Sequence, residues 1–154
     1  MEVVAKNSSK KPLSVMLVGN NPIDLNNVYD SLKNARGINY LAEVIFDTKQ
    51  AFKKALKTRP NFILIDDNLG RKELKKLLST LKDNSRTREI PITIIQNSNR
   101  DDISREGAEE FILKHQVDSD SIARTLSNSK RFSRMQAYLR LASRKRKQIF
   151  GAAK

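Results

Sequence analysis

The amino-acid sequence predicts an α/β protein with a doubly wound parallel sheet. First, five short apolar runs alternate along the chain with stretches whose apolar residues recur at helical spacing. Second, the run at residues 62–65 is uninterrupted, as in strands buried on both faces of a parallel sheet. Third, this run leads directly into Asp66 and Asp67, and in open α/β sheets ligands gather at the carboxyl ends of strands. The two aspartates are therefore candidate site residues, with helix capping or a solvated loop as the alternative.

The first strand is predicted at residues 13–18. The polar residues that follow it include Asn21, a good N-cap, and Pro22, which suits the first turn of a helix. An approximate helical stripe of apolar residues continues from there, and Gly37 is expected to end this helix.

The second strand is predicted at residues 40–46, and Asp47 or Thr48 is expected to cap the helix that follows. Pro60 terminates that helix and, by restricting the residue before it, favours an extended backbone at Arg59. The uninterrupted apolar run comes next and forms the third strand.

The second half of the chain continues the same alternation, and chirality makes the crossovers between parallel strands right-handed. Its predicted elements are a helix at 71–81, a strand at 91–95, a short helical piece at 101–107, a strand at 110–113 and a last helix that begins at Asp118 or Ser119. No proline or glycine interrupts residues 118–150, so this last helix is expected to run past the sheet and to stop at Gly151.

Composition argues against several classes of function. The chain of 154 residues has no cysteine and a single histidine, His115, which argues against disulfides, thiolate chemistry, a histidine-based zinc site and a catalytic triad. Gly19 stands alone after the first strand, so there is no glycine-rich phosphate loop. Without a nucleophile–base pair, no enzymatic role is expected. The absence of an apolar run of membrane-spanning length or of a signal peptide predicts a soluble, cytoplasmic protein.

The net charge of +13 is concentrated at the C-terminus. Residues 130–154 contain nine lysines or arginines and no acid, which leaves only +4 on the other 129 residues. Residues 1–12 are polar and lack periodicity. We therefore expect a flexible N-terminal arm at 1–12, one domain at 13–128 and a basic helical extension at 129–154.

Three segments give the chain a specific resemblance. Residues 59–66, 88–95 and 107–114, in this order and at this spacing, resemble the receiver domain of two-component response regulators. The resemblance extends over residues 13–126 and implies a flavodoxin-like fold with strand order 2-1-3-4-5. It also implies that Asp66 is the phosphoacceptor, a carboxylate that attacks a phosphoryl donor, and that Lys114 pairs with it. The alternative for Lys114 is an exposed lysine at a strand end.

The chain departs from the family at the metal-binding positions. Where the family has two acids that help to hold Mg²⁺, this sequence has Gly19 and Asn20. The remaining candidate ligands are Asp66, the side chain of Asn20 and the carbonyl of Asn68, with Asp67 as a further carboxylate nearby. Because Mg²⁺ favours carboxylate and water oxygens, the loss of two charges predicts weak or absent Mg²⁺ binding.

Other positions depart as well. Gln96 stands where the family has the Ser or Thr that contacts the phosphoryl group and switches on activation, and Ser98 is a late substitute. His115 replaces a proline that forms a cis peptide bond in the family, so this bond is expected to be trans or the loop to be strained.

These losses make the chain resemble a degenerate or atypical family member. The favoured hypothesis is a single-domain pseudo-receiver in phosphorelay signal transduction that acts through protein–protein contacts, with a histidine kinase or a phosphotransfer protein as partner. The alternative is a functional phosphoacceptor receiver that uses Asp66.

The basic extension has its own pattern. Phe132, Met135, Leu139, Ala142, Arg146 and Ile149 recur at steps of three and four, as in the seam of a coiled coil, but over fewer than three heptads. One hypothesis is an amphipathic helix that docks on a partner or on a second copy, giving a homodimer. A second is a nucleic-acid-binding or anionic-surface-binding regulator that acts through Arg144, Lys145, Arg146 and Lys147. The third is a solvated end without a specific task.

Overall fold

The computed structural model describes residues 11–97, 108 and 110–152, and side chains as far as Arg146. Most of the expected N-terminal arm and the helical piece expected at 101–107 lie outside the described residues. No helix in the part that is described is long and apolar enough to cross a membrane.

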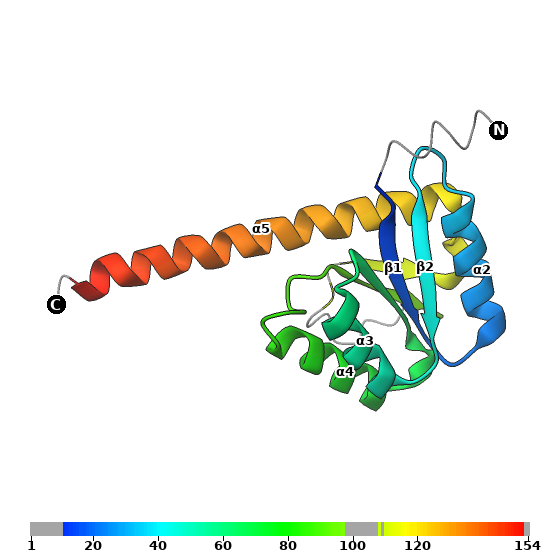
Figure 1. Ribbon diagram of the computed structural model, residues 1–154, viewed down its shortest axis with the longest axis horizontal. Coiled ribbons are helices and arrows are strands. Elements are labelled where there is room, and N and C mark those ends of the chain that lie inside the picture. Colours follow the sequence, from blue (N-terminus) through cyan, green and yellow to red (C-terminus); the bar gives the residue numbers. More distant parts are fainter. Residues whose placement is uncertain (1–10, 98–107, 109, 153–154) are drawn as a thin grey trace.

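A five-stranded sheet forms the centre of the described structure (Figure 1). Its strands pair in parallel in the order β2-β1-β3-β4-β5. They are β1 (Leu13–Val18), β2 (Tyr40–Ile45), β3 (Phe62–Asp66), β4 (Ile92–Gln96) and β5 (Glu110–Leu113). The predicted fold class and strand order are confirmed.

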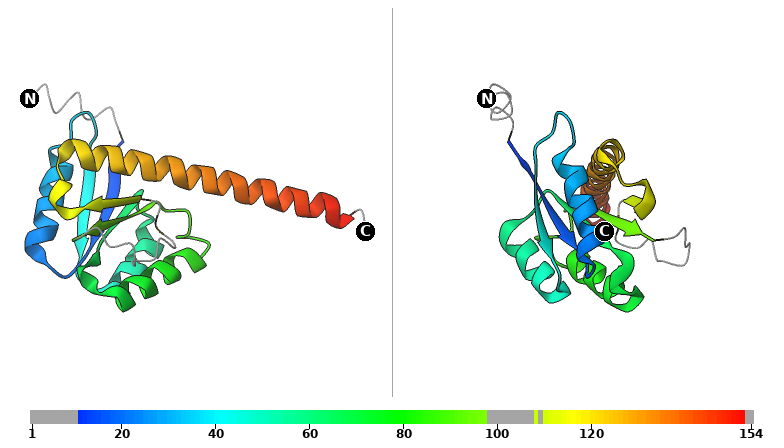
Figure 2. Two further views of the ribbon diagram at one scale, coloured as in Figure 1. Left: turned by 180° about the vertical axis from the view of Figure 1, so that it is seen from behind. Right: turned by 90° about the vertical axis from the view of Figure 1, so that its right-hand side faces the viewer.

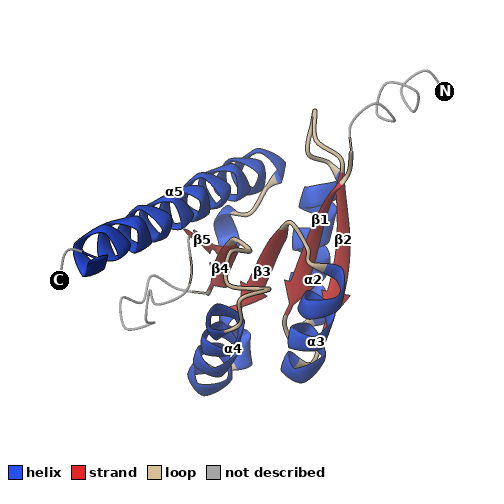
Figure 3. Cartoon of the chain, turned by 60° about the vertical axis from the view of Figure 1, so that its left-hand side comes forward, coloured by secondary structure: helices blue, strands red, loops and turns tan. Residues whose placement is uncertain are grey.

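Helices cover both faces of the sheet (Figures 2 and 3). They are α2 (Pro22–Lys33), α3 (Thr48–Thr58), α4 (Arg71–Asp83) and α5 (Ser119–Ala152). Side chains alternate along β3, so that Phe62 and Leu64 pack with α2 and α5 on one face. Ile63 and Ile65 pack with α3 and α4 on the other face. All five residues of β3 are buried, as expected for a central strand of a parallel sheet.

Local capping explains where α2 begins. The Asn21 side chain accepts hydrogen bonds from the backbone N–H groups of Ile23 and Asp24, as an N-cap does. The helix ends at Lys33, before the expected stop at Gly37, because the backbone N–H of Asn34 already closes the last turn. Gly37 instead has φ +79° in the turn that leads to β2.

The start of α3 follows the prediction and its end does not. Asp47 is the N-cap and accepts a hydrogen bond from the backbone N–H of Lys49. The expected extended backbone at Arg59 is wrong, since this residue has φ 46° and ψ 68°, in the left-handed region. This conformation satisfies the restriction imposed by Pro60 and lets the Arg59 N–H donate to the Ala55 carbonyl, 2.9 Å away.

Helix α5 is one continuous helix of 34 residues and ends one residue beyond the expected stop at Gly151. At its start, the Asp118 carboxylate accepts a hydrogen bond from the Ser121 N–H, 2.8 Å away, and this bond lowers the pKa of Asp118. Its first half buries Ile122, Leu126, Ser129 and Ser133 against the domain. Its second half extends away from the domain (Figure 1).

Candidate functional site

Four of the sequence-predicted site residues converge at the carboxyl edge of the sheet. Asp66 ends β3 and Gln96 ends β4, while Lys114 directly follows β5. Asn20 lies in the loop after β1. Because parallel strands end at the same edge, residues far apart in sequence meet there.

Asp66 and Lys114 form an ion pair at this edge. The Lys114 Nζ lies 3.0 Å from the Asp66 Oδ1, and the Asp66 side chain is buried. The backbone N–H of Asn68 donates a second hydrogen bond to the same oxygen, 2.9 Å away, from the 3-10 turn η1 (Asp67–Leu69). The Asp66 Oδ2 is also buried and has no hydrogen-bond partner among the described residues.

A second carboxylate holds the same ammonium group. The Lys114 Nζ lies 3.0 Å from the Asp24 Oδ2, which also accepts a hydrogen bond from the Asn68 Nδ2, 3.1 Å away. Partial burial alone would lower the pKa of Lys114, but hydrogen bonds and attraction from Asp24 and Asp66 outweigh it and raise this pKa above its ordinary value. The single positive charge of Lys114 is therefore shared by the carboxylates of Asp24 and Asp66.

Sequence reasoning missed Asp24. The residue lies in the first turn of α2, where an acid is usually explained by the helix dipole. One signal could have found it: Asp24 comes shortly after β1, and residues that follow the strands gather at this edge of the sheet.

Two of the candidate metal ligands, the side chain of Asn20 and the carbonyl of Asn68, hydrogen-bond to each other. The Asn20 Nδ2 donates to the Asn68 carbonyl oxygen, 3.2 Å away, so an amide group occupies the oxygen expected to face a cation. Among the described residues, no group of three or more acidic, histidine or cysteine side chains is arranged to hold a metal ion. Asp66 and Asp24 both face Lys114. Mg²⁺ requires several oxygen ligands in near-octahedral geometry, so the residues present fit this ion poorly.

Gly19, at the position of the first expected metal-binding acid, is closely packed. A Cβ atom built on Gly19 would lie 3.1 Å from the Asp66 Cβ and 3.1 Å from the Leu25 Cδ2. Any side chain at this position would displace its neighbours. The Asp66 side chain is therefore closely packed against the loop after β1.

Asp67 connects the turn η1 to the loop after β4. Its Oδ2 accepts a hydrogen bond from the Asn97 N–H, 3.2 Å away, and its Oδ1 accepts one from the Asn97 Nδ2, 2.8 Å away. The same Asn97 amide contacts the Asn68 Oδ1. Asp67 therefore fixes the loop after β4 to η1.

The remaining predicted positions are Gln96, Ser98 and His115. Gln96 is 8% exposed at the end of β4, and Ser98 lies outside the described residues. Exposed His115 lies in the 3-10 turn η2 (Lys114–Gln116), where the described backbone contains no cis peptide bond. Of the two alternatives expected at His115, the structure has the trans bond.

The predicted basic cluster lies elsewhere. Arg144, Lys145 and Arg146 are exposed on the part of α5 that extends beyond the domain (Figure 1). The side chain of Lys147 lies outside those described.

Comparison with known proteins identifies the fold. No protein-family model and no curated protein matches the chain. Solved structures do. The signal receiver domain of a modulated diguanylate cyclase from Desulfovibrio desulfuricans G20 matches with a TM-score of 0.65 and 18% identity, over 82% of this chain and 99% of that chain. The chain has the fold of response regulator receiver domains.

Two further receiver structures match equally well. The chemotaxis response regulator CheY4 of Vibrio cholerae has a TM-score of 0.65 and 20% identity, over 77% of this chain and 99% of that chain. The receiver domain of the sensor histidine kinase PA1611 from Pseudomonas aeruginosa PAO1 has a TM-score of 0.65 and 17% identity, over 78% and 98% of the two chains. That structure has a magnesium ion coordinated in its active-site cleft. In the present receiver fold, the residues at this edge fit such an ion poorly.

Proposed function

We propose that the protein is a pseudo-receiver that takes part in two-component phosphorelay signalling through protein–protein contacts, without phosphoryl transfer to Asp66. A histidine kinase or a phosphotransfer protein is the proposed partner. The observation that carries this proposal is the hydrogen bond from the Asn20 Nδ2 to the Asn68 carbonyl oxygen, 3.2 Å away, which occupies an oxygen expected to face Mg²⁺.

The chemistry of phosphoryl transfer explains why this observation matters. A transferring phosphoryl group carries negative charge on several oxygens, and a metal ion normally neutralises that charge. Here the side chain of Asn20 donates to the Asn68 carbonyl, where a cation would need an acceptor. Lys114 is shared between two carboxylates. The Asp66 Oδ1 and the Lys114 ammonium group thus pair with each other within the fold and serve as a structural ion pair.

One observation favours a second candidate function, a working phosphoacceptor. The Asp66 Oδ2 is buried and lacks a hydrogen-bond partner among the described residues, so one carboxylate oxygen is uncommitted. Buried polar atoms are normally paired, and an uncommitted oxygen is what attack on a phosphoryl donor requires.

Intact-mass spectrometry after incubation with Mg²⁺ and acetyl phosphate separates the two functions. The pseudo-receiver is expected to show no mass increase corresponding to one phosphoryl group, and the same spectrum as its Asp66→Asn variant. Stoichiometric incorporation that disappears in Asp66→Asn would favour the phosphoacceptor. Incorporation that persists in Asp66→Asn would come from another residue and would leave the pseudo-receiver assignment intact.

A further inference from the structure

Between residues 132 and 141, α5 exposes five large apolar side chains. Among them are Tyr138, 71% exposed, and Met135, 61% exposed. We call this set the outer face of α5: Phe132, Met135, Tyr138, Leu139 and Leu141. An isolated helix gains little stability in water from an apolar face that nothing covers, so this face is suited to binding.

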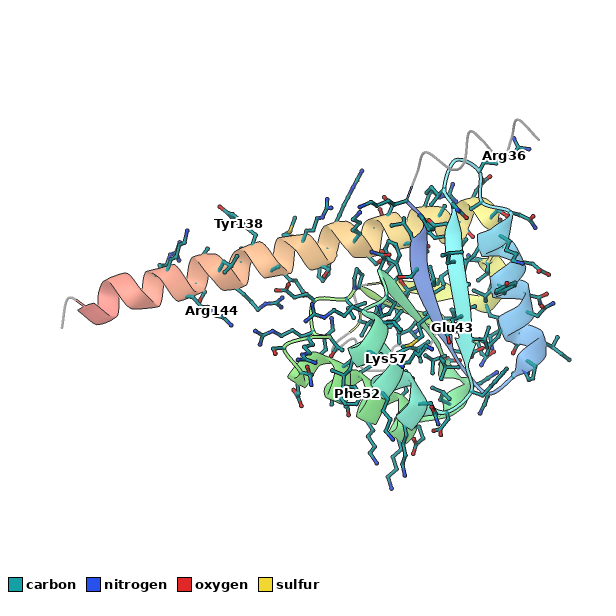
Figure 4. The ribbon with its side chains drawn as sticks, in the orientation of Figure 1. Arg36, Glu43, Phe52, Lys57, Tyr138 and Arg144 are labelled. Atoms are coloured by element: carbon teal, nitrogen blue, oxygen red, sulfur yellow. The ribbon has the colours of Figure 1, made fainter. Side chains whose placement is uncertain are left out.

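The outer face points away from the domain. At about 100° per residue, the buried residues Ile122, Leu126 and Ser133 share one side of the helix and the outer face is centred on the opposite side. The Ser133 Oγ donates to the Glu89 carbonyl, 2.7 Å away, and the Arg140 guanidinium lies 3.3 Å from the Glu89 carboxylate, which fixes that orientation. Figure 4 shows Tyr138 and Arg144 on opposite sides of the helix. The outer face therefore lies on the side of the helix opposite to its described contacts with the domain.

The width of the outer face limits which kind of partner can cover it. From Leu141 to Phe132 it spans about half of the helix circumference at about 100° per residue. A single partner helix covers only a narrow a/d stripe and would leave Tyr138 and Leu141 exposed. A deformable planar surface covers the whole face.

The charges around the outer face argue against a second copy of α5 and against nucleic acid as its partner. Arg131 and Arg134 lie near one end of the face, Lys145 and Arg146 lie near the other, and residues 130–146 contain no acid. A second copy of α5 would bring cations against cations in both the parallel and the antiparallel alignment. Nucleic acid would attract the cations but would leave the apolar side chains between them in water.

We propose that the outer face of α5 binds an anionic lipid surface. The helix would lie in the plane of the bilayer interface, with its apolar side chains at the headgroup boundary. The arginine and lysine side chains at its two ends would extend to the lipid phosphates. This interaction does not depend on the state of Asp66.

Vesicle binding tests the proposal directly. The sequence contains no tryptophan, so Tyr138→Trp provides a single fluorescent reporter on the outer face. With vesicles of phosphatidylcholine mixed with phosphatidylglycerol, its emission should shift to the blue and the protein should float with the vesicles. With phosphatidylcholine alone, neither effect should occur. Binding to the anionic vesicles should weaken as salt is added.

Matched variants distinguish vesicle binding through the outer face from nonspecific adsorption of the protein. Leu139→Ser should reduce partitioning onto anionic vesicles several-fold, since an apolar anchor is lost. Leu41→Ser should not, although Leu41 is 57% exposed and Leu139 is 58% exposed. Reversing the charges of Lys145 and Arg146 to glutamate should reduce partitioning by at least about tenfold. The same reversal at the exposed lysines Lys75 and Lys76 of α4 should have a smaller effect.

Three results would overturn the proposal. The first is equal binding to the two kinds of vesicle, or binding to neither. The second is a dimer in solution that Leu139→Ser converts to monomer, which would make the outer face a contact between copies. The third is salt-sensitive binding to duplex DNA together with vesicle binding that Leu139→Ser leaves unchanged, which would assign the helix to nucleic acid.

Discussion

The Lys114 ammonium group lies between two carboxylates that belong to distant parts of the chain, Asp24 in α2 and Asp66 in β3. Asp66 is buried, whereas the Asp24 side chain is 25% exposed. Removing the cation would leave a carboxyl group inside the protein without its partner, which costs far more than the loss of a surface ion pair.

Lys114→Met is therefore expected to lower the free energy of unfolding by about 3–5 kcal/mol, as measured by urea denaturation at neutral pH. The double variant Lys114→Met, Asp66→Asn should recover part of this loss, since the buried one of the two uncompensated charges is also removed. Lys75→Met, at an exposed site on α4, serves as the control and should change stability little. A loss that the double variant does not reduce would contradict the role given to this ion pair.

The raised pKa of Lys114 gives the pair a defined pH dependence. Because the folded protein holds the lysine proton more tightly than the unfolded chain, the ion pair stabilises the fold fully below the unfolded pKa of about 10.4. This stabilisation is lost as pH rises through the higher pKa of the folded state. The stability difference between the wild type and Asp24→Asn should thus be constant at neutral pH and shrink in strong alkali. Burial also raises the pKa of Tyr40, but both proteins contain this residue and its effect cancels. Denaturation series at several pH values measure the difference.

A substitution at Asn20 is expected to strengthen Mg²⁺ binding. Asn20→Asp replaces the amide that donates to the Asn68 carbonyl with a carboxylate beside Asp66, so Mg²⁺ affinity should rise by about tenfold or more. Calorimetric titration with Mg²⁺ measures this gain. Gly19→Asp adds the same charge but forces a Cβ to within 3.1 Å of the Asp66 Cβ, and it should instead lower the melting temperature. No increase in Mg²⁺ affinity for Asn20→Asp would show that the added carboxylate does not complete a site.

At the scale of the element, the end of α3 stores backbone strain. Arg59 has φ 46°, a conformation that costs a residue with a Cβ about 1–2 kcal/mol. Arg59→Gly should raise the free energy of unfolding by about 0.5–1 kcal/mol, after the greater freedom of glycine in the unfolded chain is subtracted. Urea denaturation measures this, and Arg59→Ala, which removes the charge but keeps the Cβ, should show no such gain. Gly37→Ala, at φ +79°, should destabilise the protein.

Elements whose signals are local were predicted well. The bounds predicted for β1 and β5 and the N-cap Asn21 agree with the structure because apolar runs and capping residues act over a few positions. The backbone of Arg59 was predicted wrongly, because the C-cap hydrogen bond from its N–H to the Ala55 carbonyl holds it in the left-handed region, against the extended backbone that Pro60 favours. In the site, the resemblance brought Asp66 and Lys114 together. Asp24 escaped notice because its contact with Lys114 depends on how α2 packs against the sheet edge.

At the scale of the molecule, α5 joins the domain and the basic extension in one helix, without a break at the expected boundary near residue 128. Contacts with the domain continue beyond that residue. Ser129 and Ser133 are buried, and Ser133 donates to the Glu89 carbonyl. We therefore propose that the independently stable unit extends to about Ser133 and that the rest of α5 serves binding rather than folding.

Truncation locates this boundary. A chain that ends after Arg134 should unfold in urea at nearly the same midpoint as the full chain. The large apolar side chains that it loses from the described part of the helix, Met135, Tyr138, Leu139 and Leu141, are exposed. A chain that ends after Asn128 loses both buried serines and leaves the Glu89 carbonyl without its serine donor. Its free energy of unfolding should fall by about 1–3 kcal/mol. In the full chain, Ser133→Ala should reproduce part of this fall, because it removes the same hydrogen bond while the helix stays whole. Equal stability of the two truncated chains would instead place the boundary at residue 128. A large loss of stability in the chain that ends after Arg134 would mean that the part of α5 beyond this residue contributes to folding.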